Sequence, residues 1–264
     1  MRALSYAVFR HPSAETFEYR AYVRGMCFNL RMNKLLYPGW DTAVCVDGDT
    51  AARYGDLFTA LGATVTREAG GRPLCEAMLW RMKPIFSGPD GPSESPRYTH
   101  LLCRDADAIT TYREAAAVTE WVASGATAHA IHDDPQHTSH LMGGMSGFEC
   151  QKLRAATGYT SWRGMIASFG DLSERGSDQT ALAKHIYPKL RRATLKHDLT
   201  GGRSVRAHPE GVDPRLWESD LTCRHIGSPG VVEMETIRFF KRFDPAYDGE
   251  GMEKRYPEIF YWHG

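Results

Sequence analysis

Short apolar runs alternate with helix-like segments through the first half of the chain, and this alternation restricts the fold more than any other feature. The predicted strands are residues 4–9, 42–47, 63–67, 98–104 and 127–131. The predicted helices are residues 19–30, 51–61, 76–85 and 111–125, the last opened by a capping box of Thr111 and Glu114. Strands and helices in alternation predict an α/β fold with a Rossmann-like, mostly parallel sheet flanked by helices.

The predicted organisation is a single domain, because an α/β chain of 264 residues commonly folds as one unit. Strand and helix signals weaken beyond Leu199. The aromatic segments near the C-terminus, RFFKRF and IFYWHG, suggest a packed tail or a lid.

The charge balance argues against nucleic acid as a partner. Lys and Arg together number 32, and Asp and Glu together also number 32. A protein that grips nucleic acid through its phosphates usually carries a strongly basic surface, which this composition does not supply.

The six cysteines are scattered without a CxxC pair, and most lie within apolar runs that suit a small buried side chain. We therefore expect a reduced, cytoplasmic setting. The apolar stretch at the N-terminus is too short for a signal peptide, and no segment approaches the roughly 18 apolar residues of a spanning helix. Any membrane contact is expected to be peripheral.

Two carboxylates, Asp105 and Asp107, directly follow the predicted strand 98–104. In an extended strand, side chains at i and i+2 point to the same side, so both acids can address one cation. Magnesium and manganese are hard cations, and one or two carboxylates plus substrate phosphates suffice to hold such an ion. Ligands of open α/β sheets bind outside the carboxyl ends of the strands, where this pair lies. The competing interpretation is two solvated acids at a strand exit.

Several further segments follow a recognisable order. They are Thr42 to Asp47, Leu79-Trp80-Arg81, Leu101 to Asp107, a predicted glycine-rich turn from Gly143 to Gly147, Asp178-Gln179 and His197-Asp198. In this order the sequence resembles D-x-D glycosyltransferases of the GT-A fold, and it is similar to the glycogenin-like and capsular galactosyltransferase-like enzymes. No lysine-proline-tryptophan segment follows His197, and the run from Arg104 to Asp107 fits a separate branch of these enzymes.

The resemblance implies one GT-A domain with a mixed, mostly parallel sheet. Residues 1–108 would form the nucleotide-binding half, and residues 109–264 the acceptor half with the C-terminal tail. The implied activity is metal-dependent transfer of a sugar from a UDP- or GDP-linked donor to a hydroxyl of a glycan or other acceptor. The cation, Mn²⁺ or Mg²⁺, would neutralise charge on the departing nucleoside diphosphate. The glycogenin-like order favours retention of the anomeric configuration.

The same resemblance implies roles for charged residues. Asp105 and Asp107 are expected to bind the cation together with the donor's ribose and diphosphate, and His197 is expected to be a third metal ligand. Arg81 or Arg104 is expected to lie near the phosphates or to brace the acids.

Further roles fall on the second half of the chain. The backbone at Gly143 and Gly144 is expected to approach the donor sugar closely, because glycine has no side chain. The resemblance places Asp178 beside the sugar as an orienting group, a base or a nucleophile, with Gln179 next to it. The competing interpretation of Asp178 is ordinary helix chemistry, in which Ser177 caps and the acid complements the helix dipole.

Two further features carry competing interpretations. Tyr6 and Phe9 can stack on a nucleotide base, or they can belong to the core. The segment from His132 to His140 can bind zinc, line the acceptor pocket or form a solvated loop, and its spacing matches no standard zinc pattern. With Asp105 and Asp107 it would suit a metal-dependent hydrolase or nuclease. The residue pattern is also compatible with a nucleotidyltransferase, or with a non-catalytic sugar-binding or assembly protein that keeps the fold.

Overall fold

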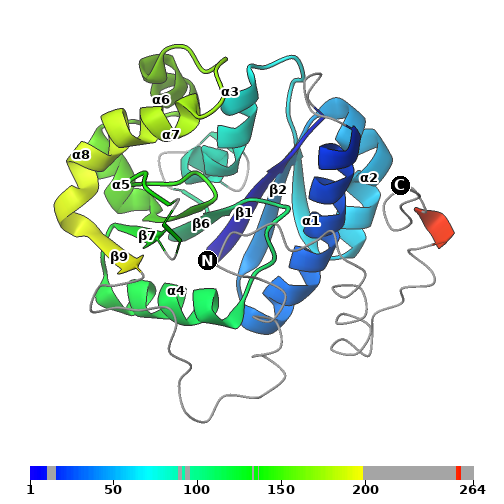
Figure 1. Cartoon of the computed structure of the whole chain (residues 1–264), viewed down its shortest axis with the longest axis horizontal. Helices are drawn as coiled ribbons and strands as arrows, with labels where there is room; N and C mark the ends of the chain where they lie inside the picture. The colour runs from blue at the N-terminus through cyan, green and yellow to red at the C-terminus, as the bar shows by residue number, and fades with distance from the viewer. Residues whose placement is uncertain are drawn as a thin grey trace, which may run out of the picture.

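The computed structural model describes residues 1–10, 16–88, 91–92, 96–132, 134–135, 137–198 and 254–256. A seven-stranded sheet with the order β3-β2-β1-β6-β8-β7-β9 lies at the centre of these residues (Figure 1). Its strands are β1 (Arg2–Val8), β2 (Asp41–Val46), β3 (Ala63–Arg67), β6 (His100–Arg104), β7 (Ala128–His132), β8 (Met145–Glu149) and β9 (Thr194–Asp198). Only β8 runs antiparallel to its neighbours in this sheet. The prediction of an α/β domain with a mixed, mostly parallel sheet is confirmed.

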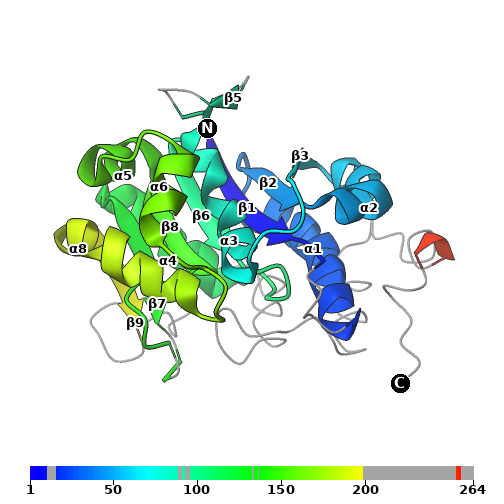
Figure 2. The same cartoon turned by 90° about the horizontal axis from the view of Figure 1, so that it is seen from above.

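Helices cover both faces of the sheet (Figure 2). One core cluster joins the sheet to α1 (Thr16–Leu36), α2 (Gly48–Ala60) and α4 (Tyr112–Ser124). The cluster on the other face includes α3 (Leu74–Met78), the 3₁₀-helix η1 (Leu79–Phe86), α5 (Cys150–Thr157), α6 (Trp162–Phe169), α7 (Ser177–Ala181), the π-helical η2 (Leu182–Ile186) and α8 (Tyr187–Leu190). A 3₁₀ turn, η3 (Arg191–Ala193), leads into β9, and a small ribbon of β4 (Ser87–Gly88) and β5 (Gly91–Pro92) precedes β6.

Side chains along β6 alternate between these two faces. Leu101 and Cys103 pack in the cluster beside η1, whereas Leu102 packs in the cluster beside α1 and α4. This period of two places Arg104 on the α4 side and turns the next residue, Asp105, toward η1. The alternation of side chains along β6 therefore determines that Arg104 contacts α4 and that Asp105 contacts η1.

The predicted limits of α4 are confirmed. The Thr111 hydroxyl accepts a hydrogen bond from the Glu114 amide at 3.3 Å, and Gly125 ends the helix in the left-handed region with φ of 69°. These are the usual N-cap and glycine C-cap devices. The Glu114 carboxylate, which the predicted capping box assigned to the helix start, is instead fully buried and pairs with Arg104, so it ties α4 to β6.

The structure corrects two predictions of local structure. Residues 76–85 were predicted as one helix, but the α-helix gives way after Met78 to the 3₁₀-helix η1, which contains Pro84. The glycine-rich segment 143–147 was predicted as a turn, but from Met145 onward it forms β8. Gly147 is needed within this strand, because a β-carbon there would lie 2.7 Å from the ring of Trp121.

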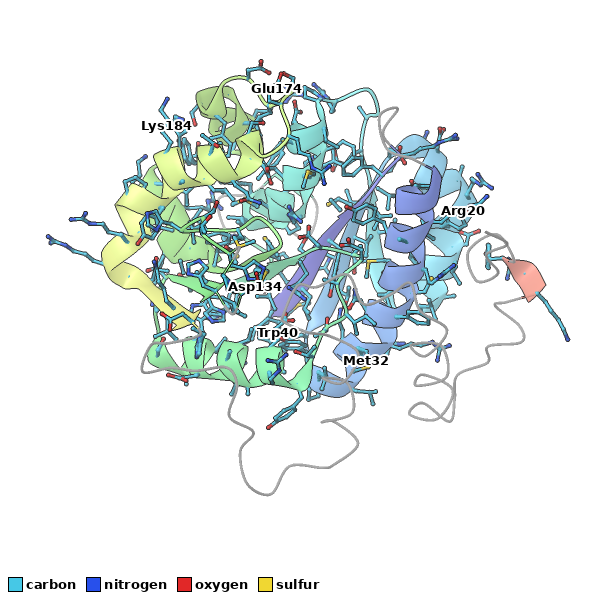
Figure 3. The ribbon with its side chains drawn as sticks, in the orientation of Figure 1. Arg20, Met32, Trp40, Asp134, Glu174 and Lys184 are labelled. Atoms are coloured by element: carbon cyan, nitrogen blue, oxygen red, sulfur yellow. The ribbon has the colours of Figure 1, made fainter. Side chains whose placement is uncertain are left out.

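Charged side chains such as Arg20, Glu174 and Lys184 are exposed and lie at the periphery of the molecule (Figure 3). The five described cysteines are buried free thiols, as the sequence pattern indicates. Among the described helices, none combines the length and apolar character needed to cross a bilayer. The expected C-terminal tail or lid lies outside the described residues, apart from 254–256, where Tyr256 packs against Tyr54 with ring centroids 5.9 Å apart.

Candidate functional site

The strand order reverses between β1 and β6, and the candidate site lies at the carboxyl ends of these strands. From β1 the chain builds the sheet outward through β2 and β3, then returns to the other side of β1 with β6. Such a reversal leaves a crevice between the loops that follow the two central strands, and ligands of open α/β sheets bind there. Asp105 and Asp107 follow β6 at this point.

The two acids interact electrostatically, although the backbone between them is not the extended strand that the sequence predicted. The chain leaves the extended conformation at Asp105, and the Ala108 amide donates to the Asp105 carbonyl at 3.4 Å. The alternation of an extended strand therefore reaches Asp105 but does not extend to Asp107. Across the turn the two carboxyls still interact, since burial first and the Asp105 charge second raise the pKa of Asp107 to about 7. The Asp105 side chain remains 38% exposed.

Arg81 links Asp105 to Asp178. It lies in η1 with only 3% of its side chain exposed, donates to the Asp105 carboxylate, and has its other terminal nitrogen 3.8 Å from the Asp178 carboxylate. Burial alone would lower the pKa of Arg81, but the charges of Asp105 and Asp178 outweigh burial and raise it above its usual value. The guanidinium is therefore a permanent positive charge between two acids.

Asp178 is buried, and neither of its carboxylate oxygens has a hydrogen-bond partner among the described residues. A buried carboxylate that lacks hydrogen bonds is costly, and such a group in a native fold calls for an explanation such as a role in ligand binding. The helix-dipole interpretation holds only in part, because Asp178 does lie in the first turn of α7, but Gly176 occupies the N-cap position instead of Ser177.

Gly143 and Gly144 form a wall of this site. A β-carbon at Gly143 would lie 2.5 Å from the Arg81 guanidinium and 3.1 Å from an Asp178 oxygen. A β-carbon at Gly144 would collide with the Asp105 carboxylate. Both positions therefore require glycine, and the structure brings the two glycines together with Arg81, Asp105 and Asp178.

Arg104 lies on the opposite face of the strand end. Its guanidinium pairs with Glu114 at 2.9 Å and donates to the Gly144 carbonyl at 2.9 Å. The side chain is fully buried, so it supports the Gly143-Gly144 backbone from the face opposite the crevice and does not reach toward a phosphate there.

Tyr6 belongs to the core. It has no exposed surface, and its hydroxyl lies 3.3 Å from both Asn33 Oδ1 and Thr110 Oγ1. Burial raises the pKa of Tyr6 to about 12. No face of this ring is available to a nucleotide base, so the core interpretation holds for Tyr6.

His197 lies far from the acids. It sits on β9, the third strand along the sheet from β6, which is about 14 Å at the usual strand spacing. Its ring contacts His129 at 2.8 Å and Glu120 of α4 at 3.1 Å, on the face opposite η1. The predicted third metal ligand is therefore not brought to Asp105 and Asp107, because the strand order separates them.

The segment from His132 to His140 is tied to the fold by several separate contacts. His132 contacts the Ser139 carbonyl at 2.9 Å, Ser139 donates to Gln179 at 2.8 Å, and His140 stacks on Tyr187. Asp133 and Gln136 lie outside the described residues. Among the residues that are described, no group of three His, Cys, Asp or Glu side chains could hold a metal ion, here or elsewhere. The Ser139 bond places this loop beside Gln179.

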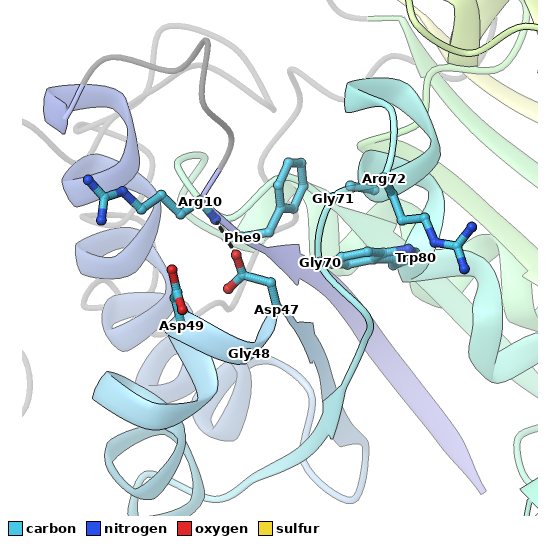
Figure 4. Close-up of a pocket in the computed structure, with 10 residues that line it drawn as sticks. Phe9, Arg10, Asp47, Gly48, Asp49, Gly70, Gly71, Arg72 and Trp80 are labelled. Carbon is cyan, nitrogen blue, oxygen red and sulfur yellow. Dashed lines mark hydrogen bonds between the residues drawn. The ribbon is translucent and has the colours of Figure 1, made fainter.

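A pocket of about 310 Å³ opens at the ends of β1, β2 and β3 (Figure 4). Phe9 and Trp80 meet edge to face in it, with ring centroids 5.5 Å apart. Asp47 accepts from the Thr50 amide at 2.8 Å, which caps α2, and from the Arg10 amide at 3.0 Å. Arg10, Arg72 and Trp80 were not predicted as site residues. The usable signals were the acid at the exit of strand 42–47 and the Gly70-Gly71 pair after strand 63–67.

Comparison of the sequence with known families finds no family model that matches, and comparison with curated proteins finds no matching relative. The function is therefore argued from the residues of this site.

Proposed function

We propose that this chain is a metal-dependent glycosyltransferase of the GT-A fold, which transfers a sugar from a nucleoside diphosphate donor to a hydroxyl of an acceptor. The observation that carries the proposal is the pair Asp105 and Asp107 at the carboxyl end of β6. The pair borders the crevice where the strand order reverses, and Arg81 holds one of its members in place.

The donor set of this pair suits a hard cation. Arg81 offsets the charge of Asp105 from one side, the charge of Asp105 still raises the pKa of Asp107, and the Asp105 side chain remains partly exposed to a cation. Mg²⁺ and Mn²⁺ prefer such oxygen ligands and retain open positions for phosphate and water. When bound, the cation would offset the charge that develops on the departing diphosphate.

The nucleoside part of the donor fits the 310 Å³ pocket. Phe9 is partly exposed, packs against the buried Trp80 and supplies apolar ring surface for a base, and Asp47 and Asp49 supply acceptors for ribose hydroxyls. An acid at the end of a neighbouring strand commonly has this ribose-binding role in doubly wound folds. The pocket adjoins η1, which carries Arg81, so a donor can extend from the base pocket toward the acids.

Asp178, Gln179 and the two glycines would serve the transferred sugar. The unpartnered oxygens of Asp178 can accept hydrogen bonds from sugar hydroxyls, and the Arg81 guanidinium, 3.8 Å away, orients this carboxylate. The missing side chains at Gly143 and Gly144 let the Arg81 guanidinium and the Asp105 carboxylate pack against this backbone, which fixes both groups beside the proposed sugar position. These residues would position the anomeric carbon for attack by the acceptor hydroxyl and exclude water from it.

Calorimetric titration of UDP and GDP, with Mn²⁺ and with a chelator, tests the proposal. We expect nucleotide binding that requires the cation and falls at least tenfold in Asp107→Asn, which keeps the shape of the side chain but removes its charge. The matched control is Asp56→Asn, at an exposed acid of α2, which should bind as the wild type does. Equal binding in the presence of a chelator would contradict the proposal.

A further inference from the structure

A second and larger cleft adjoins the proposed donor pocket and shares Trp80 and Arg72 with it. It lies between the loop after β3, η1 and α6, and its volume of about 570 Å³ is typical of small-molecule sites. Its lining combines Trp80, Trp162 and Ile166 with the cations Arg72, Lys83 and Arg163. Neither the acid pair nor Asp178 lines this cleft.

The apolar part of the cleft is built from indole rings. Trp162 is half-buried at the start of α6, where it packs against the core beside η1, and the Lys83 ammonium lies 5.9 Å from the centre of its ring. Trp80 is almost fully buried and closes the cleft toward the donor pocket. Flat aromatic surface with polar groups around it suits a pyranose ring, which has apolar C–H faces and a polar edge.

The charged part leaves one cation uncompensated. Lys83 forms an ion pair with Glu68, and Arg72 lies 3.7 Å from Glu76. Arg163 is exposed and has no ion pair among the described residues. The planar guanidinium of arginine binds carboxylate and sulfate-like groups with two parallel hydrogen bonds.

We propose that this cleft binds an acidic sugar unit of the acceptor, carrying a carboxylate or a sulfate that pairs with Arg163. The proposal rests on the proposed function, since it takes the adjoining pocket to be the donor site. Because the cleft borders the base pocket and not Asp178, the bound unit is one beyond the unit that receives the sugar. The acceptor is accordingly an acidic oligosaccharide or polysaccharide.

Binding of acidic glycans without any nucleotide tests this site. The probes are tetragalacturonate, a hyaluronan tetrasaccharide and a sulfated heparin disaccharide, with maltotetraose as the neutral control. Tryptophan fluorescence reports binding, since two indoles line the cleft. We expect at least one acidic probe to bind more tightly than maltotetraose, and its affinity to fall about tenfold in Arg163→Gln.

Two further variants sharpen the result. Arg163→Lys keeps the charge but loses the paired hydrogen bonds, so it should retain part of the affinity. Arg192→Gln, at an exposed arginine outside the cleft, should bind as the wild type does. Circular dichroism confirms that each variant is folded.

Three results would overturn the proposal: no acidic probe binds, the acidic and neutral probes bind equally, or Arg163→Gln leaves the acidic probe's affinity unchanged. Loss of UDP or GDP affinity in Arg163→Gln would assign the cleft to the donor and would also overturn it. If the wild type binds acidic glycans through Arg163 but binds no nucleotide, the glycan site stands and only sugar transfer is wrong.

Discussion

Three charged side chains and two glycines form the tightest part of the candidate site. Arg81 is buried between Asp105 and Asp178, and the guanidinium keeps both carboxylates near it. Gly143 and Gly144 close over this group, and the Gly144 carbonyl is held from behind by Arg104. A site packed in this way depends on the missing side chains as much as on the charged ones.

Replacing Gly144 tests this packing. In Gly144→Ala the new methyl group collides with the Asp105 carboxylate, so we expect a stability loss of about 1–3 kcal/mol and weaker metal-dependent nucleotide binding. Urea denaturation and calorimetric titration measure the two effects.

Gly55→Ala is the matched control for this substitution. Gly55 lies inside α2, and a β-carbon added there would meet nothing within 4 Å. Alanine at this position should therefore stabilise the protein by about 1 kcal/mol and leave nucleotide binding unchanged. If Gly144→Ala bound nucleotide as tightly as the wild type, the glycine wall would have no part in the site.

At the scale of elements, a pair of buried histidines joins β7 to the edge strand β9. His129 and His197 lie 2.8 Å apart, and His129 stacks on Trp121 of α4 with ring centroids 5.4 Å apart. Burial first, and the charges of His197 and His132 next, lower the pKa of His129 well below its usual value. The folded protein therefore holds this imidazole neutral where an unfolded chain would protonate it.

This shift predicts a loss of stability in mild acid. Below the ordinary histidine pKa of about 6.5, His129 binds a proton in the unfolded state but stays neutral in the folded state. The free energy of unfolding therefore falls as the pH falls. From pH 7 to pH 5.5 we expect a loss of about 1 kcal/mol from this group. Urea denaturation at both pH values measures it, and His129→Phe should reduce the loss. An unchanged pH dependence in the variant would show that other groups cause it.

At the scale of the whole molecule, the sheet order brings separate segments to one edge. Phe9 after β1, Asp47 after β2 and Trp80 in η1 line the proposed donor pocket, while Asp105 directly follows β6. Among the described residues, this edge of the sheet is therefore built jointly by segments that are far apart in the sequence. A ligand that spans the edge should therefore stabilise the native state as a whole.

Thermal unfolding measures this coupling. At a nucleotide concentration of about 100 times Kd, mass action adds about 2.7 kcal/mol to the stability of the native state. For a protein of this size, that corresponds to a rise of about 5–10 °C in the unfolding midpoint. We expect the rise with UDP or GDP in the presence of Mn²⁺, and neither with a chelator nor in Asp107→Asn. A rise of the same size in Asp107→Asn would separate nucleotide binding from the acid pair.

Local patterns were sufficient for much of the first half of the chain. Apolar runs predicted β1, β2, β3, β6 and β7, and the cap residues Thr111 and Gly125 predicted both ends of α4. The apolar run that predicted β6 also placed Asp105 and Asp107 directly after a buried strand. Such features depend on neighbouring residues along the chain, so periodicity and cap chemistry reveal them.

The folded chain decided what depends on distant residues. Insertion of β8 between β6 and β7 as the antiparallel strand moved His197 three strands away from the acids, and no short motif encodes that order. The turn at Asp105, the burial of Arg81 against Asp178 and the core position of Tyr6 likewise arise from packing between separate elements. The residue types alone indicated an acidic, glycine-lined site. Which of the predicted residues meet in that site was decided by long-range contacts, which local sequence does not specify.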